Sequence, residues 1–327
     1  MRNASVRGLA LAGLCLLTAP AAGAALLEED FSSDPNPHGW RVTGDPSLFH
    51  WDPQQGELAV TWDSSKANSF FHRPIGTILA KDDDFRLAFS VTLEDLAVGS
   101  TPGKAFTFEL AVGLLNIRQA AAPGYLRGTG MDSPNLIEWN YFPDSGFGAT
   151  VSTTVISTNH QWGVGFNVPV ELALTRRYQF VLDYSGATRT LRTSMSSAEG
   201  TVALKEVVLG PEFDDFRLDA LAVASYSDAG QDPQYAGSVL AHGRLDDISL
   251  RLPDPPLLNL VGGWAGGQWE MTFLGVANWV YALERSRDLR TWEAVGAAVP
   301  GLGGQQTLAD PEPSRAAAFY RVRSERP

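Results

Sequence analysis

The stretch Phe85-Arg-Leu-Ala-Phe-Ser-Val-Thr-Leu93 places an apolar residue at every second position. Because successive side chains of a strand point to opposite faces, this period predicts a β-strand with one buried and one wet face. The alternation recurs at residues 57–62, 105–110, 177–184 and 189–195. Gly- and Pro-rich turns separate these runs, and none has the period of an amphipathic helix. We therefore expect an all-β protein built as a two-sheet sandwich or a barrel.

A proline-rich stretch, Leu252-Pro-Asp-Pro-Pro256, interrupts this pattern. Three prolines in five residues predict a stiff, extended linker, which we place at residues 253–256. Alternation restarts beyond it, at residues 268–274, 279–284 and 317–323. We therefore expect one large β domain over residues 25–252 and a small β-sandwich over residues 257–327.

The N-terminus has the features of a cleavable export signal. Arg2 and Arg7 precede an uncharged apolar run, and Ala22-Gly-Ala24 offers the small residues that a signal peptidase reads, so we expect cleavage after Ala24. A membrane anchor is the alternative, but the run is well short of the ~20 residues that span a bilayer. A lipoprotein cut at Cys15 is disfavoured because Leu14 precedes it. The mature protein is expected to be secreted, periplasmic or at the cell surface.

Cysteine content and charge narrow the classes of function. Cys15 is the only cysteine and lies within the predicted signal, which excludes disulfides, thiolate metal sites and a cysteine nucleophile from the mature chain. The formal charge is −12, and without Arg2 and Arg7 it becomes −14. Because an acidic surface repels phosphate backbones, we expect no nucleic-acid partner. A neutral polysaccharide and calcium remain compatible with this charge.

Three motifs in the large domain occur in an informative order. They are Leu27-Glu-Glu-Asp-Phe31 followed by Gly39-Trp40, then Tyr178–Thr193 as two strands joined by a short turn, then Leu245-Asp-Asp-Ile-Ser-Leu250. Together they resemble the opening strand with its core tryptophan, the paired late strands and the closing strand of the concanavalin A-like lectin/glucanase superfamily, which includes legume-lectin-like and laminin-G-like jelly rolls. The resemblance implies a two-sheet jelly-roll sandwich and a carbohydrate ligand.

The C-terminal residues resemble a second kind of module. Tyr281–Trp292, Leu308-Ala-Asp-Pro311 and Ala318–Arg323 are similar to small fibronectin-III-like modules of secreted proteins from environmental bacteria. This resemblance implies a spacer or attachment role without chemistry.

The stretch Asn135-Leu-Ile-Glu-Trp-Asn-Tyr-Phe-Pro-Asp144 is the first candidate site. On a strand, Glu138 and Asn140 point to one face, whereas Trp139 and Tyr141 point to the other. Glucanases of the superfamily use a Glu-x-Asp-x-x-Glu strand. Here Asn140 stands at the position of the aspartate, and Pro143 stands at the position of the second glutamate. Since a retaining hydrolase needs two carboxyl groups, the strand favours sugar contact over catalysis. Metal binding and an ordinary polar face are the alternatives.

Acidic residues of the first and last strands form the second candidate. In jelly-roll carbohydrate-binding modules the chain ends often share a structural calcium, and carboxylates suit this ion. The candidate ligands are Glu29, Asp30, Asp246 and Asp247. Solvated charge that protects edge strands is the alternative. The run Asp82-Asp-Asp84 is expected to be a solvated turn.

Aromatic side chains are the third candidate, because sugars present C–H faces that lie flat on exposed rings. Core packing is the competing explanation for any ring in a sandwich, and it is the one we expect for Trp40. A polar loop from Ser225 to Tyr235 is long for a hairpin, which favours surface function for its two tyrosines. The candidate rings are Trp51, Trp62, Trp139, Tyr141, Trp162, Tyr226 and Tyr235.

Motifs of common enzymes are missing from the sequence. The five histidines are scattered without zinc-ligand spacing, and there is no Gly-x-Ser-x-Gly elbow, phosphate loop or dinucleotide fingerprint. We therefore expect a non-catalytic, carbohydrate-binding β-sandwich, with calcium as its candidate structural cofactor. A polysaccharide hydrolase or lyase of the same fold and a structural or adhesive surface protein remain the rival hypotheses.

Overall fold

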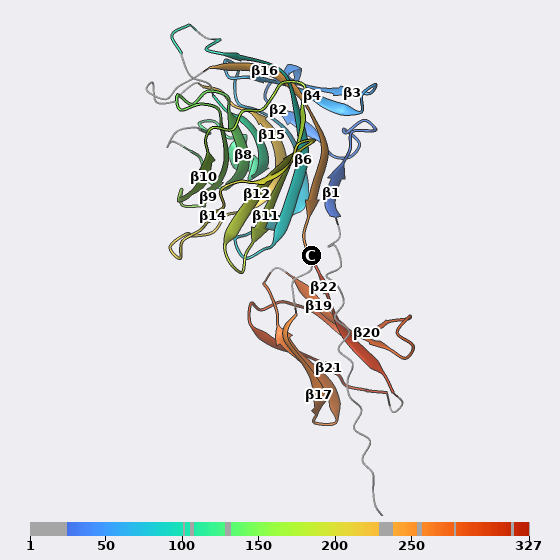
Figure 1. Ribbon diagram of the computed structural model, residues 1–327. Helices are drawn as coiled ribbons and strands as arrows, with labels where there is room; N and C mark the ends of the chain where they lie inside the picture. The colour runs from blue at the N-terminus through green and yellow to red at the C-terminus, as the bar shows by residue number, and fades with distance from the viewer. Residues whose placement is uncertain are drawn as a thin grey trace, which may run out of the picture.

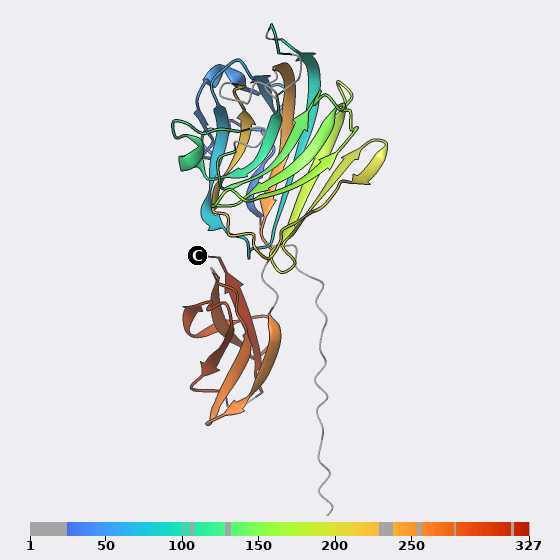
Figure 2. The ribbon, with the colours of Figure 1, turned by 90° about the vertical axis from the view of Figure 1, so that its left-hand side faces the viewer.

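The computed structural model describes residues 25–100, 102–104, 108–127, 132–228, 238–253, 257–277, 279–314 and 317–326. The chain forms a large two-sheet sandwich and a separate small β module (Figures 1 and 2). The expected fold class, an all-β jelly-roll sandwich followed by a small C-terminal β-sandwich, is confirmed. No helix of the described residues is long and apolar enough to cross a membrane.

One sheet of the large sandwich has nine strands, all paired antiparallel. Its order is β13 (Gly200–Ala203), β12 (Thr190–Ser197), β11 (Arg177–Ser185), β6 (Phe85–Val98), β16 (Val239–Arg251), β4 (Glu57–Asp63) and β3 (Phe49–Asp52), with β1 (Ala25–Glu29) beside β16 and β14 (Val207–Val208) beside β12. β6, which contains the alternating stretch 85–93, lies in the middle of this sheet.

The second sheet has seven antiparallel strands and carries the candidate strand, β8. Its order is β10 (Trp162–Asn167), β9 (Thr150–Ile156), β8 (Leu136–Phe142), β7 (Leu110–Leu115), β15 (Leu218–Ser225), β5 (Ser69–Leu79) and β2 (Arg41–Thr43). The run expected at 105–110 reaches this sheet only at Leu110, where β7 begins. Two short helices complete the sandwich, η1 (Pro46–Leu48) and α1 (Ile117–Ala120).

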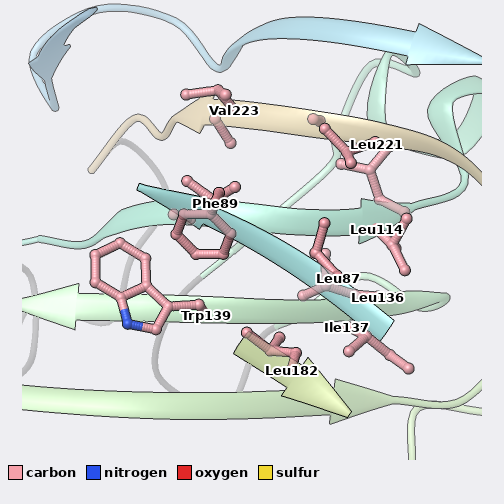
Figure 3. Close-up of a cluster of buried hydrophobic side chains, with 14 of the residues drawn as sticks. Leu87, Phe89, Leu114, Leu136, Ile137, Trp139, Leu182, Leu221 and Val223 are labelled. Atoms are coloured by element: carbon pink, nitrogen blue, oxygen red, sulfur yellow. The ribbon is translucent and has the colours of Figure 1, made fainter. Parts of the chain in front are cut away.

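Large apolar side chains fill the space between the two sheets (Figure 3). Trp139 of β8 lies against Phe89 of β6 and Phe180 of β11, with ring centroids 5.6 and 4.5 Å away. Trp40 is fully buried and stacks on Phe71 at 4.7 Å, so its expected place in the core is correct. We call the face of the seven-stranded sheet that points away from this core the outer face.

The small module has two three-stranded sheets and its own core. One sheet is β17 (Leu258–Ala265), β18 (Gln268–Leu274) and β21 (Gln305–Asp310), and the other is β20 (Glu293–Pro300), β19 (Val280–Ser286) and β22 (Phe319–Glu325). Met271, Phe273, Tyr281, Leu283 and Val322 are buried between them.

Candidate functional site

The centre of the outer face is lined by small residues. In β15 the alanines Ala220, Ala222 and Ala224 alternate with Leu221 and Val223, which point into the core (Figure 3). Alanine and glycine leave room above the sheet, and yet all three alanines are at most 1% exposed. Another part of the protein must therefore cover this face.

Gly113 of β7 supplies part of that room beside Glu138. The two residues are directly paired across β7 and β8. A Cβ at position 113 would lie 2.2 Å from the Ile137 carbonyl oxygen and 2.6 Å from Glu138 Cγ, closer than real contacts allow. The side chain of Glu138 therefore occupies the space above Gly113.

Residues 125–127, in the segment after β7, cover the centre of the outer face. The ring of Tyr125 meets the edge of Phe70 with centroids 5.9 Å apart, and the Tyr125 carbonyl oxygen accepts a hydrogen bond of 3.0 Å from Asn68. Two residues further on, Arg127 turns its guanidinium toward β8 and is only 4% exposed. The covering segment thus inserts a positive charge above the sheet.

Arg127 is the centre of a buried polar cluster. Its Nε donates to Glu138 Oε2 at 3.0 Å, its Nη1 to Asp132 Oδ1 at 2.6 Å, and its Nη2 to Asn140 Oδ1 at 3.1 Å. Nη2 also lies 3.5 Å from Glu109 Oε2. We call the group formed by Arg127, Glu109, Asp132, Glu138, Asn140 and Tyr226 the Arg127 cluster.

Tyr226 and Asn140 donate the remaining hydrogen bonds to Glu138. The Tyr226 hydroxyl donates to Glu138 Oε1, and Asn140 Nδ2 donates to Glu138 Oε2 at 3.2 Å. Glu138 is 1% exposed and Asn140 is fully buried. Both side chains were expected to bind sugar hydroxyls on an open face, and the structure corrects this expectation because their polar atoms are enclosed and bonded within the protein.

Glu109 has a strongly raised pKa within the cluster. Burial raises its pKa from 4.5 to about 8, and the nearby charges of Glu138 and Asp132 act in the same direction, while Arg127 opposes them. Neither carboxyl oxygen of Glu109 has a hydrogen-bond partner among the described residues. Burial also raises the pKa of Glu138, against the lowering effect of Arg127. A proton on Glu109 at neutral pH therefore relieves an excess of buried negative charge.

The cluster has the chemistry of a structural ion network. A retaining glycosidase places its substrate between two carboxyl groups, whereas here a guanidinium contacts both Glu109 and Glu138. Its bonds tie the covering segment to β8. Sequence reasoning found Glu138 and missed its partners. The available signal was a lone arginine in a stretch of Ala, Gly and Pro residues, eleven positions before Glu138.

Several predicted sugar-binding rings are inaccessible. Trp139, Tyr141 and Trp62 are at most 1% exposed, and Tyr226 belongs to the Arg127 cluster, so none offers a face to a ligand. Trp51 is half-buried, and its Nε1 donates to the Phe31 carbonyl at 2.8 Å. Tyr235 lies outside the described residues, as do residues 229–237 of its loop.

Among the predicted rings that the structure describes, Trp162 is the one open to solvent. It begins β10, the edge strand of the seven-stranded sheet, and is 45% exposed. Its cross-strand partner is Ile156, and Phe166 in the same strand is paired with Ser152, which places Trp162 and Phe166 on the outer face. Phe166 is 52% exposed. Four residues of strand put the two Cα atoms about 13 Å apart.

Polar side chains adjoin this aromatic row at one end. Thr158, Asn159 and His160 form an exposed turn directly before β10. Val164, between the two rings on the same face, is half-buried. We call Trp162, Val164 and Phe166 the β10 row. Its rings offer flat apolar surface. In the neighbouring turn the Thr158 hydroxyl donates to Asn135 Oδ1 at 2.8 Å and His160 Nδ1 lies 3.0 Å from the Asp132 carbonyl oxygen, so the turn offers the Asn159 amide nitrogen and His160 Nε2.

The four residues predicted to bind calcium do not form one site. Glu29 Oε1 accepts from the Phe31 N–H at 3.1 Å, and Oε2 accepts from Trp40 Nε1 at 2.9 Å and lies 2.9 Å from His38 Nδ1. Arg177 Nη2 instead bridges Asp246 and Asp247, at 2.8 and 2.7 Å.

These contacts make the predicted set a poor fit for calcium. The fourth residue, Asp30, is exposed and accepts a bond from Ser32 at 2.7 Å. Within the described part of the chain, no group of three or more His, Cys, Asp or Glu side chains is arranged to hold a metal ion. The prediction of a calcium site at Glu29, Asp30, Asp246 and Asp247 is therefore wrong. Hydrogen-bond donors of the protein and the Arg177 guanidinium contact these carboxylates where the ion was expected.

Comparison with known proteins gives matches of fold alone. No protein-family model and no curated sequence matches the chain. Peanut lectin in complex with a nonamer peptide superposes with a TM-score of 0.41 and 12% identity, over 68% of this chain and 97% of the lectin. A legume lectin-like domain from Entamoeba histolytica gives 0.43 and 10%, over 72% and 100%. The binding domain of botulinum neurotoxin serotype G gives 0.42 and 9%, over 86% and 64%.

Proposed function

We propose that this chain is an exported, non-catalytic carbohydrate-binding protein that binds a neutral polysaccharide at the β10 row. The observation that carries the proposal is the pair of half-exposed rings, Trp162 and Phe166, on one face of an edge strand beside an exposed polar turn. Rings of this kind offer large, rigid contact area for the C–H faces of sugars. The polar turn offers partners for the hydroxyl groups.

Charge and the closed Arg127 cluster support this choice of ligand and activity. A formal charge of −12 disfavours acidic polymers and leaves neutral ones. Glu138, the glutamate of the candidate strand, is enclosed and bound to Arg127, which favours binding over hydrolysis. Export remains part of the proposal, because residues 1–24 lie outside the described residues. We also propose that the small module serves as a spacer or attachment module, as the resemblance of its sequence implies.

Isothermal titration against a panel of neutral polysaccharides tests the proposal. Trp162→Ala and Phe166→Ala should each weaken binding by roughly tenfold, equivalent to about 1.4 kcal/mol, since each removes one stacking surface. Trp264→Ala is the matched control, because Trp264 is a similarly exposed tryptophan (64%) that belongs to the small module. Its affinity should equal that of the unaltered protein.

Three other results would point elsewhere. Failure to bind any polysaccharide would contradict the proposal. Loss of binding in Trp264→Ala alone would assign the ligand to the small module. If Trp162→Ala left glycan binding unchanged but altered the oligomeric state in sedimentation, the β10 row would be a protein interface, as the adhesive hypothesis requires.

A further inference from the structure

The small module contacts the large sandwich through Arg326, the residue that follows β22. Its Nη1 and Nη2 both bind the carboxylate of Asp83, with 2.9 Å between Nη2 and Oδ2. Nη2 also donates to the Ile78 carbonyl at 2.5 Å, and Nε donates to Thr77 Oγ1 at 3.2 Å. All three acceptors belong to the β5–β6 region of the large sandwich. Figures 1 and 2 show the end of the chain at the junction of the two parts.

The site that receives Arg326 is built into the turn before β6. The Asp83 N–H donates to the Ala80 carbonyl at 3.0 Å, and the Ala80 N–H donates to Asp83 Oδ2 at 2.8 Å. These reciprocal bonds fix the carboxylate, which is 2% exposed. Asp83 was expected to lie in a solvated turn, and the structure corrects this for Asp83. Asp82, its neighbour, is exposed as expected.

A buried carboxylate without a positive partner is costly, so Arg326 satisfies a need of the large sandwich. Its bidentate geometry is the strong and directional form of this ion pair. On the module side, the Arg326 guanidinium carbon lies 5.7 Å from the ring centroid of Trp279, a residue of the module core that is 5% exposed. The guanidinium thus connects hydrogen-bond acceptors of the large sandwich to Trp279 in the core of the small module.

We infer that Thr77, Ile78 and Asp83 form an arginine socket that holds the small module in one orientation on the large sandwich. The proline-rich linker alone would only space the two parts, as the sequence predicted. With the socket filled, the two parts form a single rigid unit, and a ligand bound by the large sandwich keeps a constant position relative to the module. This inference does not depend on which ligand the β10 row binds.

Measurement of the distance between two spin labels on the full chain, with Cys15→Ser so that no other thiol is labelled, tests the socket. Labels on Lys66→Cys in the large sandwich and Leu302→Cys in the module use two exposed positions. The distance distribution should be narrow in the otherwise unaltered chain. Arg326→Ala should broaden it and add longer distances, and Arg326→Lys should broaden it less, because lysine keeps the charge but loses the fork.

Arg323→Ala is the matched control, since Arg323 bonds to Glu284 and Glu325 within the module. Its distribution should stay narrow. Asp83→Asn provides a second route to the same result, because it removes the charge while nearly keeping the shape of the side chain. A broad distribution in the unaltered chain, or a narrow one in both Arg326→Ala and Asp83→Asn, would overturn the inference.

Discussion

The centre and the edge of one sheet face differ in almost every respect. At the centre, Glu138 and Asn140 are enclosed under the segment that carries Arg127. At the edge, Trp162 and Phe166 are open to solvent at 45% and 52%. All four side chains point to the outer face of the same seven-stranded sheet. Strand alternation therefore tells which face a residue is on, while the cover above that face decides whether a ligand can reach it.

The two regions also differ in chemistry. The centre contains ionisable groups withdrawn from water, which affect stability strongly because each charge depends on its partners. The edge contains rings that keep water contact until a ligand displaces it. We therefore expect substitutions at the centre to change the free energy of unfolding, and substitutions at the edge to change affinity.

The largest effect is expected for Arg127→Met, which keeps an unbranched, flexible side chain and removes the charge. The buried carboxylates of Glu138 and Asp132 would lose the positive charge of Arg127, so the free energy of unfolding should fall by about 3–5 kcal/mol. Urea denaturation followed by tryptophan fluorescence measures this change.

An exposed arginine gives the matched control for this substitution. Arg86 pairs with Asp183 at 2.6 Å, and both side chains are about half exposed, so Arg86→Met should cost at most about 1 kcal/mol. Equal losses in Arg127→Met and Arg86→Met would show that the cluster is not a buried network.

The next effect is a pH dependence due to Glu109. Its pKa is about 8 in the folded protein, above its usual 4.5, so the folded state holds the proton more tightly. The stability it contributes is complete below pH 4.5 and is lost as the pH rises through 8. Glu109→Gln copies the protonated form. At pH 9 it should be more stable than the unaltered protein by on the order of 3 kcal/mol.

Denaturation curves at pH 5 and pH 9 measure this difference. At pH 5 the two proteins should differ by no more than about 1 kcal/mol, because Glu109 is protonated in the folded protein and only the unfolded chain has begun to ionise it. Glu206→Gln, which alters an exposed partner of Arg192, should follow the unaltered protein at both values. If Glu109→Gln were less stable than the unaltered protein at pH 9, Glu109 would have to be a needed anion of the cluster.

Sequence patterns predicted most of the large-scale structure. Period-two runs gave β4, β6, β11 and β12 of the sandwich and β18, β19 and β22 of the module. The core place of Trp40 was also predicted correctly. These features depend on local alternation and on apolar bulk, both of which the sequence displays directly.

Contacts between segments that are distant in the sequence could not be predicted from these patterns. The partner of Glu138 is Arg127, in a segment without periodicity, and the partner of Asp83 is Arg326, 243 residues away. The three aspartates at 82–84 also look alike in the sequence, which therefore does not show that Asp83 is buried while Asp82 is exposed. The prediction that Trp139 binds sugar was wrong for a related reason. Alternation places Trp139 on one face of β8 but does not show that this face packs into the core.

The smallest expected effect gives the sharpest separation of the two regions. Polysaccharide affinity of the unaltered protein should change by less than about twofold, or about 0.4 kcal/mol, between pH 7 and pH 9. In this range Glu109 passes through its pKa of about 8, whereas the β10 row has no ionisable side chain and the adjoining turn has one, His160, which Glu109→Gln leaves in place. Titration at both pH values, with Glu109→Gln as the matched control, measures it. A change of affinity in the unaltered protein that Glu109→Gln abolishes would place the ligand at the Arg127 cluster and remove the distinction between a structural centre and a binding edge.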